Sequence, residues 1–98
     1  MRHLSSLTFK QLRALKAVVE MRSISRAAEE LGLTPPAVHS QLKALEDIFC
    51  SPLLLRDGPN GFQPTPEGEA LLTAFERISA SLNAAVRRID ALRSGLAG

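Results

Sequence analysis

Apolar residues recur at steps of three and four along the first half of the chain, a spacing typical of one face of an α-helix. The first predicted helix runs from Thr8 to about Met21, with Ser6 or Thr8 as its cap. Its apolar face consists of Phe9, Leu12, Leu15, Val18 and Val19. A second, shorter helix follows Ser23 or Ser25 and ends at Gly32. Its apolar face consists of Ile24, Ala27, Ala28 and Leu31.

The third predicted helix starts at Thr34-Pro35, a capping residue followed by a proline at the first helical position. Val38, Leu42 and Leu45 carry its period to about Asp47. Beyond it, Leu53-Leu54-Leu55 and Phe62 flank residues 57–61, which are rich in turn-forming Gly, Pro and Asn. We therefore expect two short strands joined by a turn after the three helices.

Thr65-Pro66-Glu67 begins a fourth predicted helix that meets no breaker before Gly95. Its apolar residues alternate steps of four and three, the heptad spacing of a helix that packs along another helix. This seam consists of Leu71, Phe75, Ile78, Leu82, Ala85, Ile89, Leu92 and Leu96. From Pro66 to Arg93 the helix would be about 42 Å long, more than the width of a three-helix core. We expect it to pair with a second copy, whereas folding over its own core would cover only Leu71, Leu72 and Phe75.

Composition excludes several classes of protein. Apolar residues make up 45% of the 98 residues, so the chain is expected to fold as one small domain. It has no apolar run near the roughly 20 residues of a membrane span and no secretory signal, so the cytoplasm is the expected compartment. Cys50 and the distant His3 and His39 suit neither a disulfide nor a metal site. Without a phosphate-binding loop, paired carboxylates or an activated nucleophile, no enzyme activity and no cofactor are expected.

Charge is unevenly distributed although the net charge is only +2. Residues 1–46 hold seven Lys and Arg against four Asp and Glu, residues 47–76 hold one against five, and residues 77–98 hold four against one. A basic first half suggests an anion-binding face, and the last helix has acid at its start and base at its end. Antiparallel pairing of that helix would place acid opposite base.

Residues 24–46 match a helix-turn-helix, in which two short helices approach closely at a turn. Ala28 is small where the helices would touch, Gly32 suits the turn, and we expect Leu33 to fill it. Val38 would pack back under the preceding helix. With a two-stranded wing behind it, such a unit is most often a DNA-reading module, because its second helix fits the major groove.

The sequence resembles the N-terminal DNA-binding domain of LysR-type transcriptional regulators. The residues that carry the resemblance are Leu12, Val18, Glu20, Ser23–Leu31, Thr34–Val38, Gln41-Leu42, Leu45-Glu46, Leu53-Leu54, Arg56, Thr65 and Gly68. The resemblance implies a mainly α fold, a winged helix-turn-helix of three helices and a two-stranded wing, followed by a long dimerisation helix. It implies domains at 1–64 and 65–94, with 95–98 starting a hinge to an effector domain that this sequence does not contain, whether as a fragment or a natural truncation.

The same resemblance implies a bacterial protein that binds promoter DNA at interrupted inverted repeats, as a dimer or, in a whole regulator, a tetramer. The third helix would read bases with Pro36, His39 and Ser40, which lie off its core face. Cations and one hydroxyl would contact the DNA backbone: Lys10, Arg13, Arg26, Thr34, Lys43 and Arg56. The dimer interface would be the seam from Leu71 to Leu92.

Some positions depart from the family pattern. Pro35 stands where Gln is usual and offers neither a side-chain donor nor an N–H. Arg22 and Cys50 stand where Gly is usual, and we expect Cys50 to be a small apolar filler beside Phe49. Residues 57–62 hold no Lys or Arg, so the wing tip has no cation for the minor groove.

One alternative remains open from the sequence. A winged helix can serve as a protein-protein interaction module that dimerises through its C-terminal helix. That reading predicts an uncharged third-helix face, and Arg26, His39 and Lys43 speak against it.

Overall fold

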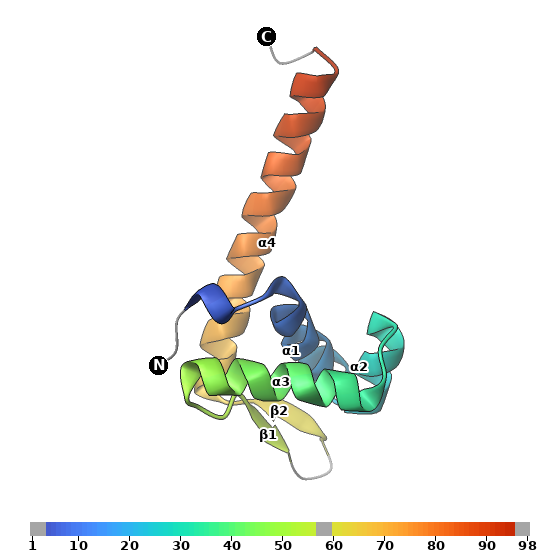
Figure 1. Ribbon diagram of the computed structural model, residues 1–98, viewed down its shortest axis with the longest axis vertical. Coiled ribbons are helices and arrows are strands. Elements are labelled where there is room, and N and C mark those ends of the chain that lie inside the picture. The colour runs from blue at the N-terminus through green and yellow to red at the C-terminus, as the bar shows by residue number, and fades with distance from the viewer. Residues whose placement is uncertain (1–3, 57–59, 96–98) are drawn as a thin grey trace.

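The computed structural model describes residues 4–56 and 60–95 and shows a winged helix-turn-helix with one long projecting helix (Figure 1). Its elements are η1 (Leu4–Ser6, a single 3-10 turn), α1 (Phe9–Met21), α2 (Ile24–Leu31), α3 (Pro35–Phe49), β1 (Leu54–Arg56), β2 (Phe62–Pro64) and α4 (Pro66–Arg93). We call α1, α2, α3 and the two strands the head. The predicted fold class is confirmed. Only η1 was not predicted, and α3 continues two residues beyond the expected end at Asp47.

The helix starts follow the capping residues in the sequence. Thr8 and Gln11 form a reciprocal pair, in which the Gln11 N–H donates to Thr8 Oγ1 at 3.2 Å and the Thr8 N–H donates to Gln11 Oε1 at 2.9 Å. Ser23, Thr34 and Thr65 cap α2, α3 and α4 in the same way through their hydroxyl oxygens. The sequence left two capping residues open for each of the first two helices, and in the structure the caps are Thr8 and Ser23.

Three helices end in a left-handed residue, at Arg22 (φ 57°), Gly32 (φ 68°) and Cys50 (φ 51°). The sequence predicted this conformation only for Gly32. The expectation for Cys50 was wrong: its side chain is exposed, and its Sγ donates to the Asp47 carbonyl at 3.6 Å. Leu33 also differs from expectation, since its side chain is 44% exposed. Its backbone N–H, which donates to the Ala28 carbonyl at 2.9 Å, closes the turn.

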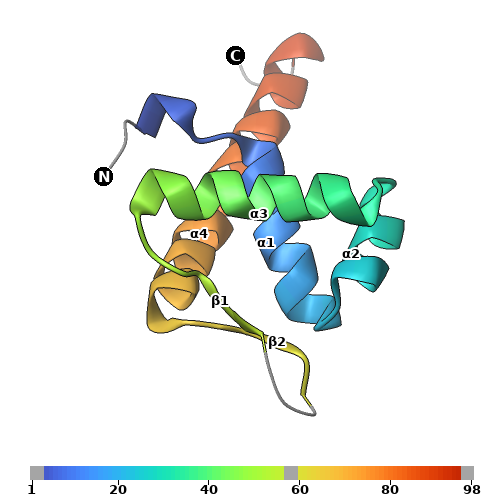
Figure 2. The same ribbon diagram turned by 60° about the horizontal axis from the view of Figure 1, so that its bottom comes forward.

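The core of the head lies around α1, which packs against both α2 and α3. Leu15, Val18, Val38 and Leu45 are fully buried, and Ala27 and Ala28 let α2 come close to its neighbours. Apolar side chains from these three helices therefore form one continuous buried cluster. The packing in this cluster fixes the angle between α2 and α3. Figure 2 shows α3 lying across the front of the head, with the wing beside it.

The wing is a two-stranded antiparallel sheet in which Leu54 pairs with Pro64, Leu55 with Gln63 and Arg56 with Phe62. It is attached to the turn between α1 and α2, because the Phe62 N–H donates to the Arg22 carbonyl at 3.4 Å. Gly61 lies so close to that carbonyl that a Cβ would overlap it. Of the predicted turn at residues 57–61, residues 57–59 lie outside the described residues.

The last helix, α4, leaves the head and accounts for the extended shape of 54 × 30 × 21 Å. Its first part packs on the head: Phe75 is 4% exposed and meets Phe9 edge-on, with ring centroids 4.9 Å apart. The prediction that Phe75 lies at a dimer interface is therefore wrong, since its own core already buries it. Leu71 and Leu72 are partly buried against the same cluster.

From residue 80 to residue 90 every side chain of α4 is exposed. The large apolar residues among the exposed positions of the helix are Ile78, Leu82, Val86, Ile89 and Leu92. Leu96, the last residue of the predicted seam, and residues 96–98 of the predicted hinge lie outside the described residues. In the part that the structure describes, no helix is both long and apolar enough to cross a membrane.

Candidate nucleic-acid interface

The outer face of α3 presents the side chains that the sequence predicted as base readers. Pro36, His39 and Ser40 are exposed, as is Lys43 one turn further along the helix. They border one surface hollow together with Ile24 from α2 and Arg56 from β1. The fold thus brings five of the predicted site residues, Pro36, His39, Ser40, Lys43 and Arg56, to a single concave surface.

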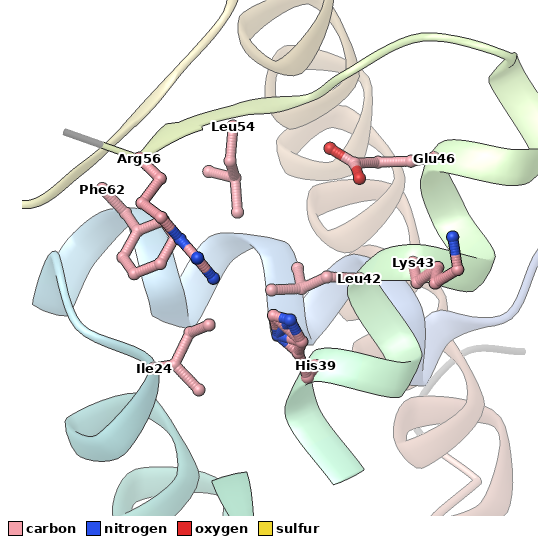
Figure 3. Close-up of a pocket in the computed structure, with 8 residues that line it drawn as sticks. All are labelled: Ile24, His39, Leu42, Lys43, Glu46, Leu54, Arg56 and Phe62. Atoms are coloured by element: carbon pink, nitrogen blue, oxygen red, sulfur yellow. The ribbon is translucent and has the colours of Figure 1, made fainter. Parts of the chain in front are cut away.

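A second hollow adjoins it between α3 and the wing (Figure 3). His39, Leu42, Lys43 and Glu46 line it from α3, and Leu54, Arg56 and Phe62 line it from the wing, with Ile24 below. The Arg56 guanidinium lies over the Phe62 ring, 5.5 Å from its centroid, and Figure 3 shows it extending into the hollow. Stacking on an aromatic ring holds a guanidinium in place while leaving its N–H donors free for an acceptor.

The first turn of α3 offers no free backbone donor. Pro35 and Pro36 have no N–H, and the Ala37 N–H donates to Thr34 Oγ1 at 3.3 Å. The Val38 N–H donates to the Thr34 carbonyl at 3.1 Å. Recognition at this end of α3 must therefore come from side chains. Thr34 itself is exposed, but its hydroxyl oxygen already accepts the capping bond.

The remaining predicted backbone contacts do not border this surface. Arg26 is exposed in the first turn of α2, where its backbone N–H donates to Ser23 Oγ at 3.2 Å. Lys10 is exposed near the start of α1. Arg13 borders a different hollow, between α1, the end of α2 and α4, together with Lys16, Glu20 and Glu30. The surroundings of Arg13 are thus of mixed charge.

Ile24 and Glu46 are among the residues at the site that were not predicted as part of it. Ile24 was assigned to the core face of α2, yet it also borders both hollows. Glu46 was quoted only in the family resemblance, yet its Oε2 accepts the Leu53 N–H at 2.8 Å and joins α3 to the start of the wing. A carboxylate near the end of a helix, just before a short connection with unpaired N–H groups, is the signal that could have indicated this bond.

Comparison with known proteins identifies the class. Residues 9–69 match the family described as bacterial regulatory helix-turn-helix proteins of the lysR family. The chain therefore belongs to the LysR family, and it covers the helix-turn-helix part of these transcriptional regulators.

Particular relatives are the regulators named CbbR. The chain is 46% identical to CbbR of Cereibacter sphaeroides over 96 residues, which cover 97% of this chain and 31% of that protein. It is 43% identical to CbbR of Xanthobacter flavus, over 89% of this chain and 26% of that protein. It thus spans about a third or less of the curated relatives that it matches.

Solved structures agree with the fold. The DNA-binding domain of BenM in complex with benA site 1 DNA superposes with a TM-score of 0.83 at 27% identity, covering 91% of this chain and 99% of that one. The LysR-family regulator CbnR superposes with a TM-score of 0.77 at 30% identity, covering 87% of this chain and 29% of that one.

Proposed function

We propose that this chain binds double-stranded promoter DNA in a sequence-specific manner, as a homodimer at an interrupted inverted repeat. The observation that carries the proposal is the concave surface on which His39, Ser40 and Lys43 of α3 meet Arg56 of the wing. An exposed helix of this kind has the diameter of the major groove, and a wing beside it reaches the flanking backbone. Such a protein would act in the cytoplasm, where the bacterial chromosome lies.

The residues have different roles in this proposal. His39 and Ser40 each combine donor and acceptor capacity, so they suit the edges of bases, and Pro36 offers an apolar contact. Lys43 and Arg56 supply charge to phosphates on either side of α3, and Arg26 does so from the start of α2. Lys10, Arg13 and Thr34 do not border this surface, so we assign them at most a peripheral contact with the DNA backbone.

Dimerisation through α4 is the second part of the proposal. Ile78, Leu82, Val86, Ile89 and Leu92 are each at least 42% exposed. Burying a large apolar side chain is worth about 1.5 to 3 kcal/mol, so this stripe favours association with a second α4. Ala85 completes the stripe. Leu71 lies outside it and borders a hollow beside the start of α4, which Phe49 and Ala74 also line. A partner helix running antiparallel would bring its C-terminal end to that hollow.

Selection of bound fragments from random duplexes tests the proposal directly. We expect the recovered sequences to share two half-sites in inverted orientation, separated by a spacer of constant length. Recovery of random sequences with no shared motif would refute sequence-specific reading. Absence of any DNA binding at low salt would instead favour the protein-protein interaction module.

A further inference from the structure

A chain of hydrogen bonds connects α3 to the start of α4. The Glu46 Oε2 of α3 accepts the Leu53 N–H at 2.8 Å, and the Leu53 carbonyl accepts the Thr65 N–H at 3.0 Å. The Thr65 hydroxyl donates to the Pro52 carbonyl at 2.8 Å and its oxygen accepts the Gly68 N–H at 3.0 Å. The path therefore runs from the helix that faces DNA, through the connection before the wing, into the first turn of α4.

The junction is tightly packed around Leu53, Thr65 and Gly68, whereas the Glu46 side chain is half-buried. Leu53 is 2% and Thr65 6% exposed, and Gly68 is buried. A Cβ at Gly68 would overlap the Leu53 carbonyl oxygen, so the first turn of α4 lies directly against that peptide group. The buried bond between the Gly68 N–H and the Thr65 hydroxyl has no solvent to replace either partner, and the partly buried bonds to Glu46 and to the Pro52 carbonyl are shielded from water on one side.

The direction of α4 depends on this junction. The helix contacts the head at Thr65 and Gly68, through Leu71 and Leu72, and at Phe75, which lies about 10 Å beyond Gly68 at 1.5 Å per residue. The junction holds the N-terminal end of this contact by directional hydrogen bonds, whereas the apolar contacts alone would leave the helix more freedom to tilt on the head. The distance along the helix from Gly68 to Ala85, in the middle of the exposed apolar stripe, is about 25 Å. A tilt of about 10° at the junction therefore moves the head by about 4 Å, roughly one base-pair rise of 3.4 Å.

From this geometry we propose that Glu46 and Thr65 are positioning residues that set the spacing between the two DNA half-sites. The inference rests on the proposed function, since it requires a dimer joined through α4. Neither residue needs to touch DNA. They fix the angle between the head and α4, and this angle determines how far apart the two α3 helices lie. Linking two heads rigidly strengthens binding only where the spacing of the half-sites matches.

The test compares Glu46→Ala with Glu46→Gln. Both variants remove the negative charge beside Lys43, but the glutamine amide oxygen still accepts the Leu53 N–H. Affinities are measured on one half-site and on inverted repeats whose spacers differ by one or two base pairs, built from sequences selected by the original chain. A second pair, Thr65→Val and Thr65→Ser, removes or keeps the hydroxyl. Circular dichroism shows whether each variant folds.

We expect the original chain, Glu46→Gln and Thr65→Ser to favour one spacer by about tenfold or more over its neighbours. For Glu46→Ala and Thr65→Val the preference should fall below about threefold, while the affinity of Thr65→Val for one half-site stays within about twofold of that of Thr65→Ser. An unchanged spacer profile in Glu46→Ala and Thr65→Val overturns the inference, and so does an equal loss of Thr65→Val binding on the single half-site. If the original chain itself shows no spacer preference, the proposed dimeric function fails before the variants are compared.

Discussion

His39 and Ser40 stand one turn before Lys43 on α3, and in the proposed function the first two side chains read bases and the third contacts a phosphate. Replacing His39 with Ala should cost about 1 to 3 kcal/mol on the selected site and broaden the base preference, because donors and acceptors at base edges carry sequence information. Replacing Arg26 with Ala should weaken all sequences alike, because phosphates are the same at every base. Binding to a panel of single-base variants of the site measures both effects.

Arg87→Ala is the matched control, since it removes the same charge as Arg26→Ala from an exposed position on α4 far from the head. It should leave affinity nearly unchanged. If His39→Ala keeps the base preference of the original chain, His39 does not read bases.

Cys50 adopts a left-handed conformation that favours glycine. We expect Cys50→Gly to raise the free energy of unfolding by about 0.5 to 1 kcal/mol, because relief of the backbone strain exceeds the added entropy of the unfolded chain. Urea denaturation measures the change. Ser51→Gly is the control: Ser51 follows directly but has no positive φ, so glycine there should only destabilise. Equal stability of Cys50→Gly and the original chain would contradict a backbone strain larger than the entropy cost of glycine.

Single residues show where prediction from sequence succeeds and where it fails. Thr34 and Thr65 were predictable as caps, because a hydroxyl before a proline has one obvious local partner. The left-handed Arg22 and Cys50 were not, because neither side chain favours that conformation and only the packing of the following segment imposes it. Glu46 was missed as a junction residue for a similar reason, since its acceptor role depends on where the chain returns after α3.

At the scale of elements, the proposed dimer depends on α4. Leu82 is 50% exposed in the middle of its apolar stripe, so Leu82→Glu should place a charge inside the proposed interface. We expect a monomer with a folded head in sedimentation, and loss of tight binding to the full inverted repeat. Ala80→Glu introduces the same charge at an exposed position two residues earlier, off the stripe, and should remain dimeric. A dimeric Leu82→Glu protein would place the interface elsewhere.

The seam illustrates how far periodicity alone reaches. Steps of four and three identified the length and the apolar face of α4 correctly, but they could not tell which part packs on its own head. Phe75 belongs to the core because Phe9 lies opposite its ring, a contact between residues 66 positions apart that no local pattern reveals. Val86 was missed because it stands beside the ideal heptad positions, although it is 53% exposed.

For the whole molecule, the charge distribution predicts a strong dependence of DNA binding on salt. If each head neutralises about three phosphates with Arg26, Lys43 and Arg56, a dimer displaces about six counterions. Affinity should then fall by about three orders of magnitude between 50 and 200 mM salt. Fluorescence anisotropy with a labelled duplex measures the slope, and Arg56→Ala should make it shallower. Affinity that does not change with salt would contradict phosphate binding by these side chains.

The exposed far part of α4 links the amount of helix in the protein to its concentration. Extending a helix beyond its packed part gains little free energy per residue in water, because propagation is close to neutral even for good helix formers. A helical end without tertiary contacts is therefore only marginally stable. Residues 80–90 have exposed side chains throughout, whereas the head has its own buried cluster. On dilution below the dissociation constant of the dimer, the end of α4 should therefore unwind while the head stays folded. The magnitude of the ellipticity at 222 nm would decrease with dilution while the head remains folded. Addition of DNA that carries both half-sites would restore the helical signal.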